Sequence, residues 1–224
     1  MHLGLIGGIG PAATEFYYRQ LVAASVERGR PLDLTIVHAD LCEMLRNLTA
    51  NARSVQADVF RGLANRLHGA GADRVAITSM AGHFCVREFE AVSPLPVVNA
   101  IQAVRAELAR RQITDVGMLG TRVVMESHLY GALSDVTVRL PEGDDLVTTD
   151  REYIAMARAG RATDEQRAFF FRTGRALHGK GAQVVLLAGT DLFLAFDGRE
   201  SGVATIDCAT VHVEALARLA FADD

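Results

Sequence analysis

The chain repeats a pattern of apolar strand and glycine at an offset of about 110 residues. The matching segments are 4–8 with 117–121, 71–79 with 181–189, and 96–98 with 205–207. A duplication would produce such a repeat and predicts two homologous lobes. The alternative is that all buried parallel strands look alike, because valine and leucine dominate them. The shared Gly-x-Gly-Ala lead-in at 179–182 and 69–72 favours duplication.

Strand-length apolar runs alternate with segments of helical period. We expect strands at 3–6, 34–37, 74–78, 97–98, 116–119, 137–139, 184–187 and 204–206. We expect helices near 12–29, 51–70, 84–91, 101–111, 123–133, 147–159, 163–180 and 209–221. This alternation is typical of parallel sheets covered by helices. It predicts an α/β fold of two pseudo-symmetric lobes, 1–100 with 208–224 and 101–207, with the active-site cleft between them.

Composition excludes several classes of partner. The 224 residues are half hydrophobic and carry a net charge of −4 without a basic tract, so nucleic acid is not an expected partner. No apolar run approaches the roughly 18 residues of a membrane helix. Three cysteines at irregular spacing and a strand-like start without signal-peptide features predict a cytoplasmic location. No metal-ligand spacing is present, and we expect no metal.

Four loops follow expected strands, at 7–14, 78–83, 120–127 and 188–192. Ligands of open α/β sheets bind beyond the carboxyl ends of the strands. Small and hydroxylated residues before a helix suit a carboxylate or phosphate, because the helix start offers N–H groups and a positive dipole end. The Gly-Gly-x-Gly-Pro run at 7–11 differs from dinucleotide-binding spacing, and a tight turn explains its glycines. We therefore expect no nucleotide cofactor.

Together these loops resemble the aspartate/glutamate/hydantoin racemase superfamily, and aspartate racemases in particular. The matching motifs are Gly-Gly-Ile-Gly-Pro-Ala-Ala-Thr at 7–14, Leu-Gly-Thr-Arg at 119–122 with Met125, Glu126, Ser127 and Tyr130, Lys-Gly-Ala at 180–182, Ala-Gly-Thr-Asp at 188–191, and Ile206-Asp207 with His212. The resemblance implies a cofactor-independent amino-acid racemase-like isomerase. It also implies a homodimer and a small carboxylate or amino acid as ligand.

In racemases of this superfamily, two cysteine thiols flank the α-carbon of the substrate. One removes the α-proton and the other delivers a proton to the opposite face, which suits a thiol whose pKa is lowered toward the working pH. The family motifs are Cys-Asn-Thr-x-His and Gly-Cys-Thr-Glu. Here they read Ser79-Met80-Ala81-Gly82-His83 and Ala188-Gly189-Thr190-Asp191. Ser79 and Gly189 thus take the cysteine positions, and two-thiol racemisation is not expected.

The resemblance assigns catalytic positions to Ser79, His83 and Asp191. His83 could act as acid or base near neutral pH, or only order its loop through hydrogen bonds to the backbone. Asp191 could act as a general base on the solvent side of the site or as a helix N-cap. The positions expected to bind substrate are Gly10, Thr14, Arg46, Met80, Ala81, Thr121, Arg158, Gly189 and Thr190.

Two arginines and the three cysteines leave alternatives open. Arg46, expected in the loop after the second strand, and Arg158 could bind a dicarboxylate bidentately, or could be solvated surface residues. Cys85 or Cys208 could replace a lost thiol, or could pack as a small apolar side chain. Cys42 is expected in the core.

These observations lead to a racemase-family enzyme that acts on a small carboxylate or amino acid with altered or weak chemistry. A lyase, decarboxylase or hydratase that needs a single base is compatible with the same residues. A catalytically silent binder of a carboxylate is the other alternative, because both cysteine positions have changed.

Overall fold

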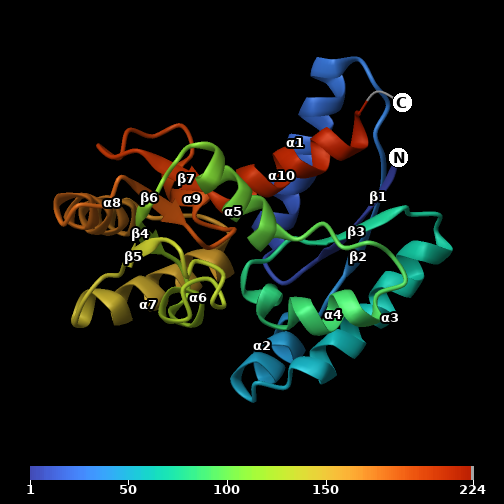
Figure 1. The fold of residues 1–224 in the computed structure, drawn as a ribbon, viewed down its shortest axis with the longest axis horizontal. Helices are drawn as coiled ribbons and strands as arrows, with labels where there is room; N and C mark the ends of the chain where they lie inside the picture. The colour runs from blue at the N-terminus through green and yellow to red at the C-terminus, as the bar shows by residue number, and fades with distance from the viewer. Residues whose placement is uncertain (223–224) are drawn as a thin grey trace. The chain divides into compact units, whose positions relative to one another are not determined.

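The computed structural model describes residues 1–222 and divides the chain into two compact units (Figure 1). Unit 1 contains Met1–Ala100 and the chain from His212 onward, and unit 2 contains Ile101–Val211. The last two residues of the predicted range 208–224 lie outside the described residues. Within residues 1–222, no helix has the length and apolar character needed to cross a membrane.

Unit 1 is built on a parallel sheet with the strand order β2-β1-β3. The strands are β1 (His2–Gly7), β2 (Asp33–His38) and β3 (Arg74–Ile77). β1 lies in the centre and is buried from its second residue onward, as expected for a strand that is covered on both faces. A single parallel bridge joins Val75 to Val97 and adds a fourth position beside β3.

Helices cover both faces of this sheet. They are α1 (Pro11–Arg28), α2 (Leu41–Thr49), α3 (Arg53–Gly69), the 3-10 helix η1 (Ala81–Cys85), α4 (Val86–Val92) and the later part of α10 (Cys208–Ala220). Figure 1 shows α1 and α10 on one face of the sheet, and α3 and α4 on the other. This arrangement of helices on both faces is typical of parallel sheets.

Unit 2 repeats this topology in a sheet of order β5-β4-β6-β7. The strands are β4 (Asp115–Leu119), β5 (Thr137–Arg139), β6 (Val184–Leu187) and β7 (Thr205–Asp207), and all pairs are parallel. β4 takes the central position that β1 has in unit 1, and β6 takes the position of β3. Val185 pairs with Thr205 as Val75 pairs with Val97. Residues 79 and 189 consequently follow corresponding strands at the same distance.

The helices of unit 2 are α5 (Ala100–Arg110), α6 (Arg122–Glu126), α7 (Asp144–Ala159), α8 (Asp164–Gly179), α9 (Phe193–Phe196) and the start of α10. α8 begins with a capping box in which Thr163 and Gln166 exchange hydrogen bonds, and it packs on β4 and β6. Its residue Phe170 joins Met156 of α7 and Leu187 of β6 in the core.

The α/β fold of two helix-flanked parallel sheets is as predicted, but several elements differ. The expected helix 123–133 ends at Glu126, because His128, Leu129 and Tyr130 have positive φ angles of 48°, 58° and 59°. The expected strand 97–98 forms only the bridge at Val97. The segment after β2, expected as a loop, forms helix α2, which Asp40 caps by accepting a hydrogen bond from Glu43 N–H.

Candidate functional site

The loop after β1 is held by one hydroxyl. Thr14 Oγ1 accepts a hydrogen bond from Gly8 N–H at 3.0 Å and donates to the Gly10 carbonyl at 3.1 Å. It also lies 3.1 Å from Thr78 Oγ1, which follows β3. Gly8 has φ +93°, and a Cβ there would lie 2.4 Å from His38 Nδ1, so only glycine fits. The loop thus brings the start of α1 and the end of β3 together.

The segment after β3 is compact and buried. The Ser79 side chain accepts a hydrogen bond from Gly82 N–H at 3.3 Å, and Ser79 is only 6 % exposed. Met80 is buried, and Ala81 starts η1. Unit 1 therefore places Gly10, Thr14, Ser79, Met80 and Ala81 at one edge of its sheet, beyond the carboxyl ends of β1 and β3.

His83 is fully buried and both its ring nitrogens have backbone partners. Nδ1 lies 2.7 Å from the Ser79 carbonyl and therefore donates to it, and Nε2 accepts from Ala100 N–H at 3.2 Å. Burial lowers the pKa of His83 to about 4. A neutral ring whose two nitrogens are occupied favours the loop-ordering role of His83 over acid–base chemistry.

His212, on α10, packs edge to face against His83, with the ring centroids 6.1 Å apart. Its Nε2 donates to the Val98 carbonyl and its Nδ1 accepts from Tyr17 O–H, each at 2.9 Å. Burial and the neighbouring His83 lower the pKa of His212 to about 3. Both histidines are therefore uncharged structural groups at neutral pH.

In unit 2 the loops after β4 and β6 lie against each other. A Cβ on Gly120 would lie 3.0 Å from the Ala188 carbonyl oxygen, so the two strand ends approach closely. Thr121 follows at the N-cap of α6, but its hydroxyl makes no capping hydrogen bond. Its Oγ1 is buried and, within the described part of the chain, has no hydrogen-bond partner. A buried hydroxyl without a partner is costly, and a ligand oxygen would satisfy it.

Position 189 has no free space. A Cβ there would lie 2.4 Å from Tyr153 Cε2 on α7, so the tyrosine ring fills the volume that a side chain would need. The Tyr153 hydroxyl donates to Asp191 Oδ2 at 3.2 Å, and burial and this carboxylate raise the tyrosine pKa well above its usual range. Asp191 is 3 % exposed, so its expected position on the solvent side is wrong. The N-cap of α9 is Leu192, so the expected capping role of Asp191 is wrong as well.

Two further groups stand at the end of β7. Asp207 accepts hydrogen bonds from Ala209 N–H, Thr210 N–H and the Thr210 hydroxyl, and burial raises its pKa to about 6. Cys208 is buried, and desolvation together with Asp207 and Asp191 raises its pKa well above the usual range. Its thiol consequently stays protonated at neutral pH.

The other cysteines do not supply a reactive thiol to these loops. Cys85 is buried, and burial and Glu88 raise its pKa to about 12, which fits apolar packing. Cys42 is exposed on α2, so its predicted core position is wrong. Its exposure follows from α2 itself, because the buried face of that short helix carries Met44 instead.

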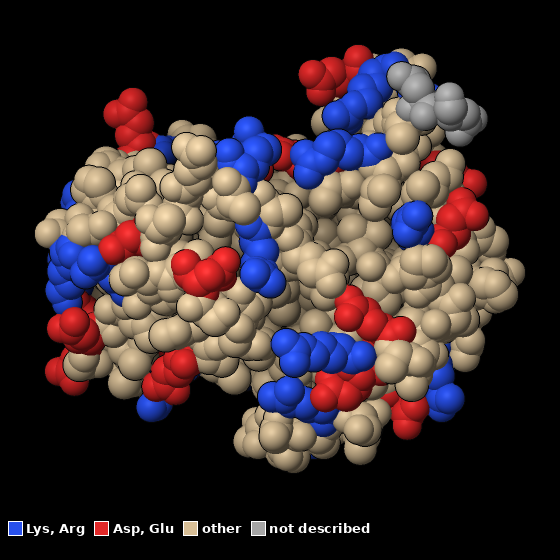
Figure 2. All heavy atoms as spheres, in the orientation of Figure 1, with Lys and Arg blue, Asp and Glu red and all other residues tan. Residues whose placement is uncertain are grey.

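The predicted carboxylate-binding arginines are both exposed. Arg46 lies on helix α2, not in a loop as expected, and Arg158 lies in the last turn of α7. Neither guanidinium forms an ion pair with any described residue. Figure 2 shows basic and acidic side chains mixed on the face drawn. Within residues 1–222, no three His, Cys, Asp or Glu side chains are placed to hold a metal ion.

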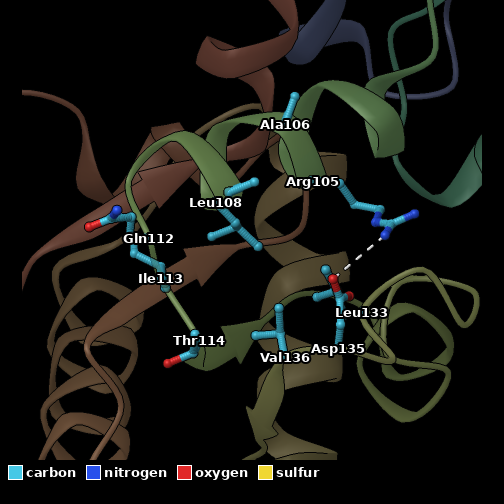
Figure 3. A pocket seen from close by; sticks show the side chains of 10 residues that line it. Arg105, Ala106, Leu108, Gln112, Ile113, Thr114, Leu133, Asp135 and Val136 are labelled. Atoms are coloured by element: carbon cyan, nitrogen blue, oxygen red, sulfur yellow. Dashed lines mark ion pairs between the residues drawn. The ribbon is translucent and has the colours of Figure 1, made fainter.

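A separate hollow of about 470 Å³ lies between the end of α5 and the segment that leads into β5 (Figure 3). Leu108, Ile113, Leu133 and Val136 line it, and Arg105 pairs with Asp135 at 3.7 Å. These residues precede β4 and β5, so the hollow lies at the amino ends of the strands. It is distinct from the loops that carry the predicted ligand contacts.

Tyr153 is the residue that sequence reasoning missed. As an aromatic residue on an amphipathic helix it is indistinguishable in sequence from a core residue, and it does belong to the core cluster of unit 2. The only signal in the sequence is that residue 189 is a glycine and leaves the volume of a side chain vacant. The sequence does not identify the residue that occupies this volume. The pairing of Tyr153 with Asp191 depends on the packing of α7 against the end of β6.

Residues 6–216 match the protein family described as Asp/Glu/Hydantoin racemase. The chain is also similar to solved structures along almost its whole length. A protein from Yersinia pestis described as a candidate Asp/Glu racemase aligns with a TM-score of 0.85 and 24% identity, over 98% of this chain and 99% of its own. An aspartate racemase homologue from Pyrococcus horikoshii gives 0.80 and 24%, over 98% of each chain.

A glutamate racemase from Francisella tularensis, solved with D-glutamate, aligns with a TM-score of 0.67 and 15% identity, over 98% of this chain and 81% of its own. At these identities the solved structures establish the shared fold.

Proposed function

Since the chain belongs to the Asp/Glu/hydantoin racemase family, we propose that it binds a small amino acid or carboxylate at the carboxyl ends of its strands. The binding half of this proposal rests on the Thr121 hydroxyl, which is buried without a partner among the described residues in a loop of the expected site. An anionic oxygen would accept its hydrogen bond. Within unit 1, the Ser79 hydroxyl, which accepts from Gly82 N–H and keeps its own hydrogen, and the start of α1 offer donors of the same kind.

The chemistry that we propose uses one acid–base group instead of two thiols. Ser79 and Gly189 stand at the positions that the family resemblance pairs with cysteines, and the buried thiols of Cys85 and Cys208 have raised pKa values. We assign this role to Asp191, whose buried carboxyl follows β6 and accepts a hydrogen bond from the Tyr153 hydroxyl. A single base supports decarboxylation, elimination or hydration, but not proton exchange between two opposite faces. By family resemblance we further propose a homodimer that needs no cofactor, and from the number and spacing of the cysteines we propose a cytoplasmic location.

Binding is tested by titrating the protein calorimetrically with D- and L-aspartate, D- and L-glutamate, malonate and maleate. We expect at least one to bind, and Thr121→Val to weaken that binding by about tenfold, the effect of one lost hydrogen bond. The matched control is Thr137→Val on the exposed start of β5, which should bind as the native protein does. Absence of binding for the whole panel would contradict the proposal.

The alternative is a catalytically silent carboxylate binder. It is favoured by the replacement of both cysteine positions and by the occupied ring nitrogens of His83. NMR of each bound compound during long incubation separates the two functions. Turnover of any of these compounds would exclude the function of a silent binder. Tight binding without turnover would contradict the function of an enzyme.

A further inference from the structure

Position 189 and Tyr153 exclude each other sterically. A Cβ on Gly189 would lie 2.4 Å from Cε2, 2.7 Å from Cζ and 3.0 Å from the hydroxyl oxygen of Tyr153. Contacts this short do not occur in folded proteins, so a residue with a side chain at 189 would displace the ring. The end of the ring that carries the hydroxyl therefore lies where the side chain of residue 189 would begin.

The ring is held there from two sides. Tyr153 is 7 % exposed and packs in the core cluster with Met156, Phe170 and Leu187. Its hydroxyl donates to Asp191 Oδ2 at 3.2 Å. A buried carboxylate needs hydrogen-bond donors to replace water, and this hydroxyl supplies one. The ring cannot leave without opening a cavity and removing a donor from Asp191.

The acidic groups around Asp191 explain why such a donor matters. At the start of α10, burial together with Asp207 and Asp191 raises the pKa of Cys208, and Cys208 in turn adds to the burial that raises the pKa of Tyr153. None of these groups carries a positive charge. A neutral phenol, kept protonated by burial and by the carboxylate, donates a hydrogen bond to Asp191 without adding negative charge.

We infer that Tyr153 takes the place of the missing side chain at position 189 and acts as a positioning residue that holds Asp191 as the acid–base group of this half of the site. The inference rests on the proposed function, which makes Asp191 that group. In place of a thiol, this face of the site presents a phenol edge and a carboxylate oriented by it. Glycine at 189 is then a requirement of the site, because any side chain would displace the Tyr153 ring that donates to Asp191.

The test is the pH dependence of binding of whichever amino acid of the aspartate and glutamate panel binds tightest. If Asp191 is the acid–base group, its carboxylate favours binding of the ligand ammonium group, and we expect binding to weaken when that carboxylate is protonated. Tyr153→Phe keeps the ring and removes the hydroxyl. We expect the acid midpoint of binding to rise by about one pH unit, as one hydrogen bond to a charged group predicts. Tyr18→Phe, on the exposed side of α1, is the control and should not move it.

A second variant tests the steric conflict between a side chain at position 189 and the ring of Tyr153. Gly189→Ala should weaken binding of the same probe and raise the acid midpoint, because its Cβ displaces the ring. Gly179→Ala is the control, since a Cβ there meets nothing within 4 Å. An unchanged midpoint in both Tyr153→Phe and Gly189→Ala, with native binding intact, overturns the inference and leaves the proposed function standing. Failure of the native protein to bind any probe overturns both.

Discussion

Adding a side chain at position 189 should lower the stability of the protein by a measurable amount. Gly189→Ala forces the ring of Tyr153 out of the core, and overpacking of this kind costs about 1–3 kcal/mol. We predict this loss in the free energy of unfolding, measured by urea denaturation. Gly179→Ala near the end of α8 should instead stabilise slightly, because alanine is the better helix former. Equal stability of the two variants would contradict the packing described for Tyr153.

The buried histidines predict a dependence of stability on acid pH. The pKa of His83 is lowered to about 4 and that of His212 to about 3, against 6.5 for an unfolded histidine. Above pH 6.5 both states are neutral and the stability is fully present. As the pH falls from 6.5 toward 4, these histidines become protonated in the unfolded chain but stay neutral in the native state. The free energy of unfolding therefore falls, by about 3 kcal/mol for His83 alone.

Urea denaturation at pH 7 and at pH 4.5 measures this effect. His83→Gln should reduce the difference between the two pH values, while lowering the stability at pH 7 through lost hydrogen bonds. His68→Gln, on the exposed face of α3, should leave the difference as it is in the native protein. An unchanged pH dependence in His83→Gln would show that His83 is not a buried neutral group.

Among the elements, the β1–α1 loop depends most on one side chain. Thr14→Val removes the hydroxyl that joins Gly8, Gly10 and Thr78, and leaves the partly buried Gly8 N–H without its acceptor. We predict a loss of about 2–3 kcal/mol in the free energy of unfolding. Thr14→Ser retains the hydroxyl and should recover most of this loss. Urea denaturation of both variants checks the prediction, and equal values would contradict the role of the hydroxyl.

Elements with a strong local signal could be predicted from the sequence, and those set by context could not. Thr137–Arg139 and Val184–Leu187 form strands with the predicted bounds. The helix α2 was not predicted, because its nine residues are too few to show a clear helical period and were expected to form a loop. The helix after Arg122 was predicted too long, because the left-handed residues from His128 to Tyr130 have no glycine among them to signal the break.

For the molecule as a whole, the internal repeat predicted the fold well. Strand order β2-β1-β3 with the Val97 bridge matches β5-β4-β6-β7, so the two α/β units share one topology. Of the candidate site, only the residues in the loops directly after the strands could be predicted from the sequence. Tyr153 meets Asp191 across 38 residues of sequence, and such a contact depends on how α7 packs against β6. No periodicity along the chain encodes it.

The central claim is that this family member does not exchange protons through two thiols. Incubation of the protein with aspartate and with glutamate in heavy water, followed by NMR of the α-proton, tests it most directly. We expect no rapid loss of the α-proton signal and no appearance of the other enantiomer. Rapid exchange with racemisation would show that this protein racemises amino acids after all. If that exchange also disappeared in Cys85→Ala or Cys208→Ala, it would identify the thiol responsible.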